Sequence, residues 1–264
     1  MIECVINISE GRDRDLVQEI ALCAGTDLLD VHSDPDHNRS VLTVIGATAP
    51  HAIIRAAVQR LDLRSHSGVH PRIGVVDVVP FVPLPPSTFD DAVISRDATA
   101  WWIANQLGIP VFLYGEERTL PDIRRGAFTT LAPDLGPTEP HPTAGAVAVG
   151  ARNLMLAWNL WLAEPNLEQA KAIAASIRGP SVRALGLQVG EQVQVSMNLI
   201  DPLMVGPATI YDRVAAVASI NHAELVGLAP QAVLDAVDAN RWEQLDLSPE
   251  TTIEWRLEQR RPLN

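Results

Sequence analysis

Residues 2–8, with the sequence Ile-Glu-Cys-Val-Ile-Asn-Ile, decide how the fold begins. Every second side chain in this stretch is apolar, and the polar Glu3 and Asn7 stand between them, which predicts a β-strand with one buried face. Residues 12–24 then place apolar side chains at helical spacing along one face. The chain therefore opens with a strand followed by a helix.

The same change of hydrophobic period recurs further along the chain. Strands are predicted near residues 27–33 and 39–46, on either side of the turn-forming residues 34–38. A helix over residues 49–62 and a strand over residues 73–79 follow. The order of elements is β-α-β-β-α-β, which is the split βαβ, or ferredoxin-like, arrangement.

The second half of the chain shows the same order of elements. The elements expected there are a strand over 153–162, a helix over 166–178, strands over 182–189 and 192–200, a helix over 207–220, a short strand or loop, and a helix over 230–240. We therefore expect an α+β fold of two ferredoxin-like (split βαβ) subdomains, with residues 1–145 in the first and 146–264 in the second.

A proline-rich segment, residues 132–145, connects the two expected subdomains after a helix over 88–108 and a strand over 111–114. Proline fixes φ and cannot donate to a β-ladder, so this segment is predicted to be extended and stiff. It suits either a linker or a loop that lines a ligand. We favour the second, because a groove between two domains is a common binding site.

The composition limits the classes of function. The chain has 264 residues, 47% hydrophobic and 20% charged, which excludes intrinsic disorder. The net charge of −12 argues against nucleic acid as a partner, because proteins that bind it carry a basic excess. No apolar stretch approaches the roughly 18 residues that cross a bilayer, and no signal peptide is recognised. We expect a cytoplasmic protein with no membrane partner.

Five of the seven histidines lie within residues 32–70. Gly68 and Pro71 argue against a helix around His66 and His70, so these two imidazoles are not presented as a helical zinc motif presents them. A loop imidazole beside guanidinium groups suits proton transfer, because it titrates near neutrality. The alternative is that these are ordinary exposed loop histidines.

Three other positions have chemistry that the sequence leaves open. Asp77 lies in an apolar strand and needs partners, so it either orients a catalytic base or accepts hydrogen bonds from buried backbone amides. Arg39 follows a turn and is placed to meet an anion. Residues 9–11 join a strand to a helix, where backbone N–H groups can bind an anion, although Ser9 is equally suited to cap the helix.

Several segments, in the same order along the chain, resemble the formiminotransferase domain of the glutamate formiminotransferase and formiminotransferase-cyclodeaminase family. The segments that carry this resemblance are ECVINISEGR (3–12), LLDV (28–31), NRSV (38–41), HSGVHPRIGVVDV (66–78), PFVP (80–83), VFLYGE (111–116), APDLGP (132–137), GAR (150–152), QVSMNLID (194–201) and ELVGL (224–228). They span nearly the whole chain, and the block 66–78 is the most specific.

The resemblance implies a reaction and an architecture. The reaction is transfer of the formimino group from N-formimino-L-glutamate to tetrahydrofolate, which gives 5-formiminotetrahydrofolate and glutamate. The architecture is two ferredoxin-like subdomains with a folate-binding ligand groove between them, and no cyclodeaminase domain. Tetrahydrofolate is then a co-substrate, no metal is required, and a homodimer is expected.

The resemblance also implies particular site residues. His70, in the His-Pro-Arg motif, is the catalytic general acid and base, and Arg39 and Arg72 are candidates to bind the substrate carboxylates. The loop that contacts folate corresponds to Gly136, Pro137, Thr138, Glu139, Pro140, His141, Pro142, Thr143, Ala144 and Gly145.

Two positions depart from the pattern of the resembled family. His32 stands where the family has an acidic residue, so the candidates for orienting the catalytic base are Asp30, His32 and Asp77. Ala144 stands where well-studied members have tryptophan, which removes an aromatic surface for stacking on the pterin.

Three other functions remain as alternatives. The first is a family member with another formyl or formimino donor or acceptor. The second is a non-catalytic folate-binding protein that keeps the groove. The third is a metal hydrolase whose ligands are Asp30, His32, His37 and His66.

Overall fold

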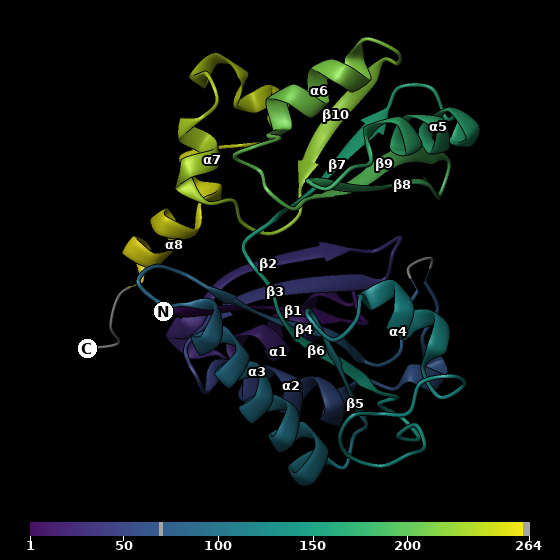
Figure 1. Ribbon diagram of the computed structural model, residues 1–264, viewed down its shortest axis with the longest axis vertical. Helices are drawn as coiled ribbons and strands as arrows, with labels where there is room; N and C mark the ends of the chain where they lie inside the picture. Colours follow the sequence, from purple (N-terminus) through teal and green to yellow (C-terminus); the bar gives the residue numbers. More distant parts are fainter. Residues whose placement is uncertain (69–70, 261–264) are drawn as a thin grey trace. The chain divides into compact units, whose positions relative to one another are not determined.

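Two β-sheets, each covered by its own helices, make up the structure (Figure 1). The computed structural model describes residues 1–68 and 71–260. The architecture is mixed α/β with two separate sheets, which agrees with the expected α+β class. No helix among the described residues is long and apolar enough to span a membrane.

The chain divides into two compact units. The first is Met1–Asn153, and the second begins at Leu154. The sequence analysis placed this boundary after residue 145. The structure places it later because strand β6 (Val147–Ala151) pairs in parallel with two strands of the first sheet.

The first unit contains six strands and four α-helices within its described residues. Its elements are β1 (Ile2–Ile8), α1 (Arg14–Leu22), β2 (Leu28–Asp34), β3 (Arg39–Ile45), α2 (Ala49–Arg60), β4 (Val76–Pro83), α3 (Phe89–Trp102), β5 (Val111–Tyr114), α4 (Leu120–Gly126) and β6, with short 3₁₀ or π turns at Gly25–Asp27, Leu63–Ser65 and Ile103–Leu107.

The strand order of the first sheet is β2-β3-β1-β4-β6-β5. The neighbours among β2, β3, β1 and β4 are antiparallel, whereas β6 is parallel to both β4 and β5. The predicted order β-α-β-β-α-β is therefore present from β1 to β4. The sequence analysis missed β6, because a parallel strand buried on both faces shows a continuous apolar run instead of an alternation.

Helices cover both faces of this sheet. On one face, α1, α2 and α3 pack on the core that includes Cys4, Ile6 and Ile8, as the alternation in β1 predicts. On the opposite face, α4 covers β4, β5 and β6 through a smaller cluster that contains Ile123 and Phe112. Strand β4 is therefore buried on both sides, and so is any polar residue within it.

Helix α1 begins later than the sequence analysis assumed. The side chain of Asp13 accepts a hydrogen bond from the backbone N–H of Leu16, so Asp13 is the N-cap. Ser9 does not cap this helix; its buried hydroxyl donates to the carbonyl of Gly74 at 2.8 Å. Ser9 therefore ties the end of β1 to the segment that leads into β4.

The second unit has a four-stranded antiparallel sheet in the order β10-β7-β9-β8. Its elements are β7 (Leu156–Leu162), α5 (Leu167–Ile177), β8 (Val182–Val189), β9 (Gln192–Leu199), α6 (Pro207–Ala215), β10 (Ile220–Leu225), α7 (Gln231–Asp235) and α8 (Ile253–Gln259), with 3₁₀ turns at Ala239–Arg241, Glu243–Leu245 and Pro249–Thr251. The predicted order of elements is present, although α6 and α7 end earlier than expected. Trp158, fully buried in this core, donates from Nε1 to the carbonyl of Leu245.

Gly145 stands at a close approach of two chain segments in the first unit. Its φ is +72°, and a Cβ at this position would lie 2.3 Å from the carbonyl oxygen of Ile73. The backbone of Gly145 pairs with Gly74, so the proline-rich loop and the segment before β4 are held together here.

We predict that Gly145→Ala lowers the free energy of unfolding by about 2–5 kcal/mol, because it adds both a left-handed strain and a steric clash. Gly108→Ala is the matched control. Its φ is +64°, but a Cβ there meets no atom of the described residues within 4 Å. The control should lose only about 1–2 kcal/mol in urea unfolding. Equal losses for the two variants would contradict the close approach.

Candidate active site

The side chain of Glu10 accepts hydrogen bonds from the backbone of the connection between β1 and α1. Glu10 Oε1 accepts hydrogen bonds from the backbone N–H groups of Gly11, Arg12 and Asp13, at 2.9, 2.8 and 2.9 Å. The sequence analysis considered the backbone N–H groups of residues 9–11 as one possible anion site. The structure instead gives the N–H of Gly11 to Glu10 and the N–H of Ser9 to the carbonyl of Val75.

Asn38 lies in the turn before β3. It joins this turn to the connection from β1 to α1 and to the loop that contains His66 and Ser67. Its Oδ1 accepts from the N–H of Gly11 at 2.9 Å, and its Nδ2 donates to the carbonyl of Ser67 at 2.9 Å. The side chain is buried, and the backbone has φ 50°, a left-handed conformation that asparagine tolerates better than most residues. One buried amide therefore holds three segments in register.

His66 is a neutral link between Asn38 and Arg72. Its Nε2 lies 2.9 Å from the carbonyl oxygen of Asn38, which only accepts, so Nε2 carries the proton. Its Nδ1 accepts from Nη1 of Arg72, which only donates. Burial lowers the pKa of His66, and the nearby Arg72 charge lowers it further, although the hydrogen bond to Asn38 opposes them. Both ring nitrogens are therefore committed to holding the loop.

Arg72 is also tied to the loop backbone. Its Nη2 donates to the carbonyl of Gly68 at 2.6 Å, while Nη1 donates to His66. The predicted substrate-binding arginine therefore uses part of its guanidinium to hold the segment that surrounds it.

Asp34 and His37 form a second polar link at the turn between β2 and β3. His37 Nδ1 lies 2.6 Å from Asp34 Oδ2, and Asp34 Oδ1 accepts from two backbone N–H groups of the turn. Burial opposes ionisation of Asp34, but the hydrogen bonds from His37 outweigh it and lower the pKa of Asp34 to about 2. Asp34 stands opposite Arg39 across the strand pair.

Asp77 is the extra residue of a β-bulge in β4. Asn7 pairs with Val78 and Ile8 with Val76, so Asp77 has no partner of its own in β1. A bulge redirects the side chain it contains, and bulges are frequent beside active sites. The bulge places a carboxylate that is only 2% exposed within the apolar strand.

Two donors satisfy this buried carboxylate. Oδ1 accepts from the backbone N–H of Ile73 at 2.7 Å, and Oδ2 accepts from Nη2 of Arg124 at 2.8 Å. Burial lowers the pKa of Arg39 and of Arg72, and in both cases the negative charge of Asp77 opposes that shift. Asp77 is therefore the carboxylate around which Arg39, Arg72 and Arg124 gather.

Arg124 is the residue of this cluster that the sequence analysis missed. It lies in α4, a helix that begins with a capping box in which Thr119 and Asp122 bond each other's backbone. That signature was readable in the sequence. The neighbouring Arg125 is exposed and pairs with Asp122, so only the tertiary structure distinguishes the inward arginine from the outward one.

The proline-rich loop is an ordered part of the first unit. Nδ1 of His141 accepts from the backbone N–H of Ala144 at 3.0 Å, and the backbones of His141 and Gly145 exchange hydrogen bonds at 2.9 Å. The carbonyl of Thr143 accepts from Leu63, which places this end of the loop against the histidine-rich segment.

The predicted folate-contacting residues divide into exposed and buried groups. Residues 136–140 are exposed, whereas His141 and Thr143 are half-buried. Ala144 is only 1% exposed and belongs to the core under α1–α3. Its side chain therefore contributes packing and is not on the loop surface.

The remaining predicted site residues are not all brought together. Asp30 and His32 lie on β2, opposite Thr43 and Val41 of β3, and they share the sheet face of Arg39. Both are half-buried. His70, the predicted catalytic base, lies outside the described residues.

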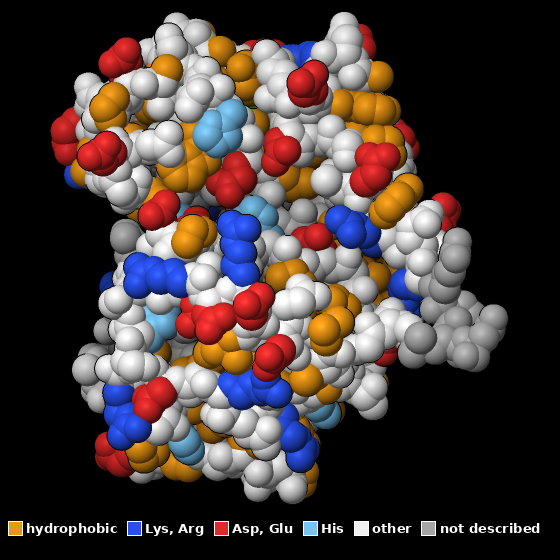
Figure 2. Space-filling model, turned by 180° about the vertical axis from the view of Figure 1, so that it is seen from behind, with side chains coloured by type: hydrophobic (Ala, Val, Ile, Leu, Met, Phe, Trp, Pro, Cys, Tyr) orange, Lys and Arg blue, Asp and Glu red, His pale blue; other side chains and the backbone are white. Residues whose placement is uncertain are grey.

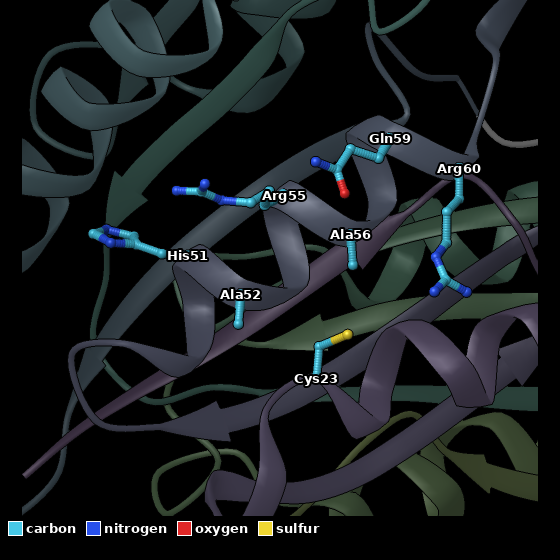
Figure 3. Close-up of a pocket in the computed structure, with 7 residues that line it drawn as sticks. All are labelled: Cys23, His51, Ala52, Arg55, Ala56, Gln59 and Arg60. Carbon is cyan, nitrogen blue, oxygen red and sulfur yellow. The ribbon is translucent and has the colours of Figure 1, made fainter.

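A separate cavity lies on the other face of the first sheet. A cavity of about 430 Å³ lies along α2 and the end of α1, lined by Cys23, His51, Ala52, Arg55, Ala56, Gln59 and Arg60 (Figure 3). His51 stacks on Trp102 with ring centroids 4.1 Å apart, and Arg55 lies over the same ring. These helices cover the face of the sheet opposite to α4, so this cavity is separate from the arginine cluster.

A metal centre has no ligand set within residues 1–68 and 71–260. No group of three or more His, Cys, Asp and Glu side chains there is arranged to hold an ion. In the metal-hydrolase alternative, His66 would need a free ring nitrogen, but both contact Asn38 and Arg72.

The surface mixes the two signs of charge. On the face drawn in Figure 2, basic side chains form separate groups among acidic ones. In a chain of net charge −12, binding of an anionic substrate therefore depends on a local gathering of cations, such as the arginines around Asp77.

Residues 1–152 match the family model described as formiminotransferase domain, N-terminal subdomain. The chain belongs to this formiminotransferase family. The expectation drawn from the sequence motifs is confirmed.

Named relatives agree with this assignment. The chain is 37% identical over 275 residues to the glutamate formimidoyltransferase of Thermoplasma acidophilum, covering 89% of this chain and 90% of that protein. It is 33% identical over 275 residues to that of Streptococcus pyogenes serotype M1, covering 90% and 92%. It is 35% identical over 281 residues to the formimidoyltransferase-cyclodeaminase of Sus scrofa, covering 89% of this chain and about half, 51%, of that longer protein.

We predict that His66 makes folding stability depend on pH just below neutrality. Its pKa is lowered in the native state, so the unfolded chain takes up a proton first as the pH falls through about 6.5. Stability therefore rises with pH through this window, by at most about 1.4 kcal/mol per pH unit. In His66→Gln, whose amide can make both hydrogen bonds without titrating, this contribution should disappear. Urea unfolding between about pH 5 and 7 measures it; an unchanged slope in the variant would contradict the neutral link.

Proposed function

We propose that this chain transfers the formimino group of N-formimino-L-glutamate to tetrahydrofolate. The observation that carries the proposal is the similarity to glutamate formimidoyltransferases over about nine-tenths of both chains. The arginine cluster around Asp77 supports it, because the donor is an anion with two carboxylates. Tetrahydrofolate is then the co-substrate, and the reaction uses no metal.

In this proposal His70 moves the proton. It accepts the proton that the N5 amine of tetrahydrofolate loses on attacking the amidine carbon, and it returns a proton to the departing glutamate nitrogen. A positioned base of this kind contributes typically about 10²–10⁴ in rate. His66 is unsuited to the role because both of its ring nitrogens are engaged.

Asp77 positions the segment that carries the base. It holds the backbone N–H of Ile73, three residues after His70, and it balances the charges of Arg39 and Arg72. We propose that these two arginines bind substrate carboxylates. Asp30 and His32 remain candidates to orient the base, because they share the sheet face of Arg39.

The proposed architecture is two ferredoxin-like subdomains with the ligand groove between them. The orders β2-β3-β1-β4 and β8-β9-β7-β10, with all neighbours antiparallel, support the first part, because each follows a β-α-β-β-α-β order. The loop at residues 136–145 is proposed to contact folate, and its exposed residues 136–140 are accessible for this. The subdomains that the sequence predicts are residues 1–145 and 146–264.

We also propose that the protein acts in the cytoplasm as a homodimer. Ile94 and Trp101, two turns apart on one face of α3, are 66% and 55% exposed. An apolar helix face of this kind is typical of an interface between copies.

We predict that the purified protein converts formiminoglutamate and tetrahydrofolate to 5-formiminotetrahydrofolate and glutamate. His70→Asn should lower kcat by about 10²–10⁴, because it removes the proton carrier. His51→Gln is the control: His51 stacks on Trp102, on the sheet face opposite to α4, and its loss should leave kcat within about twofold of the wild-type value. The measurement is the rate of folate product formation. A fully active His70→Asn enzyme would refute the assignment of the base.

We predict that reduced folate stabilises the protein against heating. At a free concentration about 100 times Kd, ligand binding adds about 2.7 kcal/mol to the free energy of unfolding. A thermal-shift titration measures this effect. The absence of any shift would count against both the transferase and a non-catalytic folate-binding protein.

A further inference from the structure

Arg124 has a geometry suited to holding a second anion. It lies in α4 with its side chain about one-quarter exposed, and its Nη2 donates to Asp77, which is only 2% exposed. Within residues 1–68 and 71–260, this is the only hydrogen bond that the side chain of Arg124 makes. A guanidinium carries five N–H donors in a planar fork, so the other nitrogens keep their donors.

The bond to Asp77 fixes how that fork is presented. Asp77 is itself held by the backbone N–H of Ile73, so the carboxylate cannot follow a moving side chain. A guanidinium anchored through one nitrogen by a rigid carboxylate loses less conformational entropy when its other nitrogens bind a ligand. Arg124 is therefore preorganised for a planar, bidentate anion such as a carboxylate.

The charges around Arg124 also favour an anion. Arg39 lies close enough that the two guanidiniums repel each other, which lowers the pKa of Arg39 in addition to its burial. Arg72 also interacts electrostatically with Asp77. The other carboxylate near Arg39 is Asp34, which pairs with His37. The buried Asp77 thus interacts with three arginines, and a further carboxylate reduces the repulsion between Arg39 and Arg124.

We infer that Arg124 binds one of the two carboxylates of the formimino donor and makes the site selective for a dicarboxylate. This inference rests on the proposed function, whose carboxylate-binding candidates were Arg39 and Arg72 alone. A third arginine fits because the donor brings two carboxylates, while Arg72 already donates to His66 and Gly68.

The test compares donors that differ by one charge. N-formimino-L-glutamate is assayed beside its two monoamides, in which either the α- or the γ-carboxylate is a neutral carboxamide. Each donor is tested with the wild-type protein, Arg124→Gln, Arg124→Lys and Arg125→Gln. Arg125 is the matched control, because it is the next residue of α4 but is exposed and pairs with Asp122.

In the wild-type protein, amidation of the carboxylate that Arg124 binds should lower kcat/KM by about 10- to 100-fold, the usual effect of losing a charge-assisted pair. In Arg124→Gln, KM for formiminoglutamate should rise by a similar factor, and discrimination against that one amide should fall to within about threefold. Arg125→Gln should behave as the wild type does.

The variant Arg124→Lys is included in case Arg124→Gln fails to fold. Removing the guanidinium leaves Asp77 without its charged partner, so Arg124→Gln is checked by circular dichroism and thermal melting. Lysine keeps the charge for Asp77 but loses the fork, so it should raise KM by about 5- to 20-fold with little change in kcat. If Arg124→Gln does not fold, the lysine variant decides.

The inference is overturned if the Arg124 variants discriminate among the three donors as Arg125→Gln does. A wild-type protein that does not turn over formiminoglutamate refutes the proposed function instead. Calorimetric titration with L-glutamate and L-glutamine then decides the role of Arg124 alone. Binding of glutamate that is weakened in Arg124→Gln and retained in Arg125→Gln supports it, and equal binding by both variants refutes it.

Discussion

The pair of the buried Asp77 and the partly exposed Arg124 is the interaction on which the arrangement of the site depends. A carboxylate that is 2% exposed in an apolar strand is tolerable only with charged and hydrogen-bonding partners, and breaking such a pair typically costs about 3–5 kcal/mol. The bulge in β4 directs Asp77 toward α4, and the second bond, to Ile73, fixes the chain just before the strand. Asp77 therefore holds both the segment before β4, through Ile73, and the guanidinium of Arg124.

The polar links around Asp77 explain how an acidic protein maintains a cationic site. Asn38 and His66 use their hydrogen bonds to hold backbone segments and Arg72, so they position charge without adding any. The Glu10 carboxylate accepts hydrogen bonds from the backbone of the turn that follows it. Because charges are screened beyond about 8–10 Å in physiological salt, this local order outweighs the distant surface carboxylates for a bound anion.

Much of the fold was predictable because hydrophobic period is a local property. The alternation in residues 2–8 predicts β1, and the same reasoning predicts the order of elements through β4 and again from β7 to β10. It failed for β6, whose burial on both faces removes the alternation, and it did not identify Asp13 as the cap of α1. At the site, motifs indicated Arg39, Arg72 and Asp77, but no pattern indicated Arg124.

The sequence by itself determined the family, the order of strands and helices from β1 to β4 and from β7 to β10, and the presence of a polar residue in the apolar strand β4. Those features depend on neighbouring residues and on motifs within single segments. Only the tertiary structure decided which groups meet: that Asp77 takes an arginine from α4, that Ala144 is buried, and that both nitrogens of His66 are engaged. These contacts join residues far apart in the chain, and their partners depend on the packing of several elements at once.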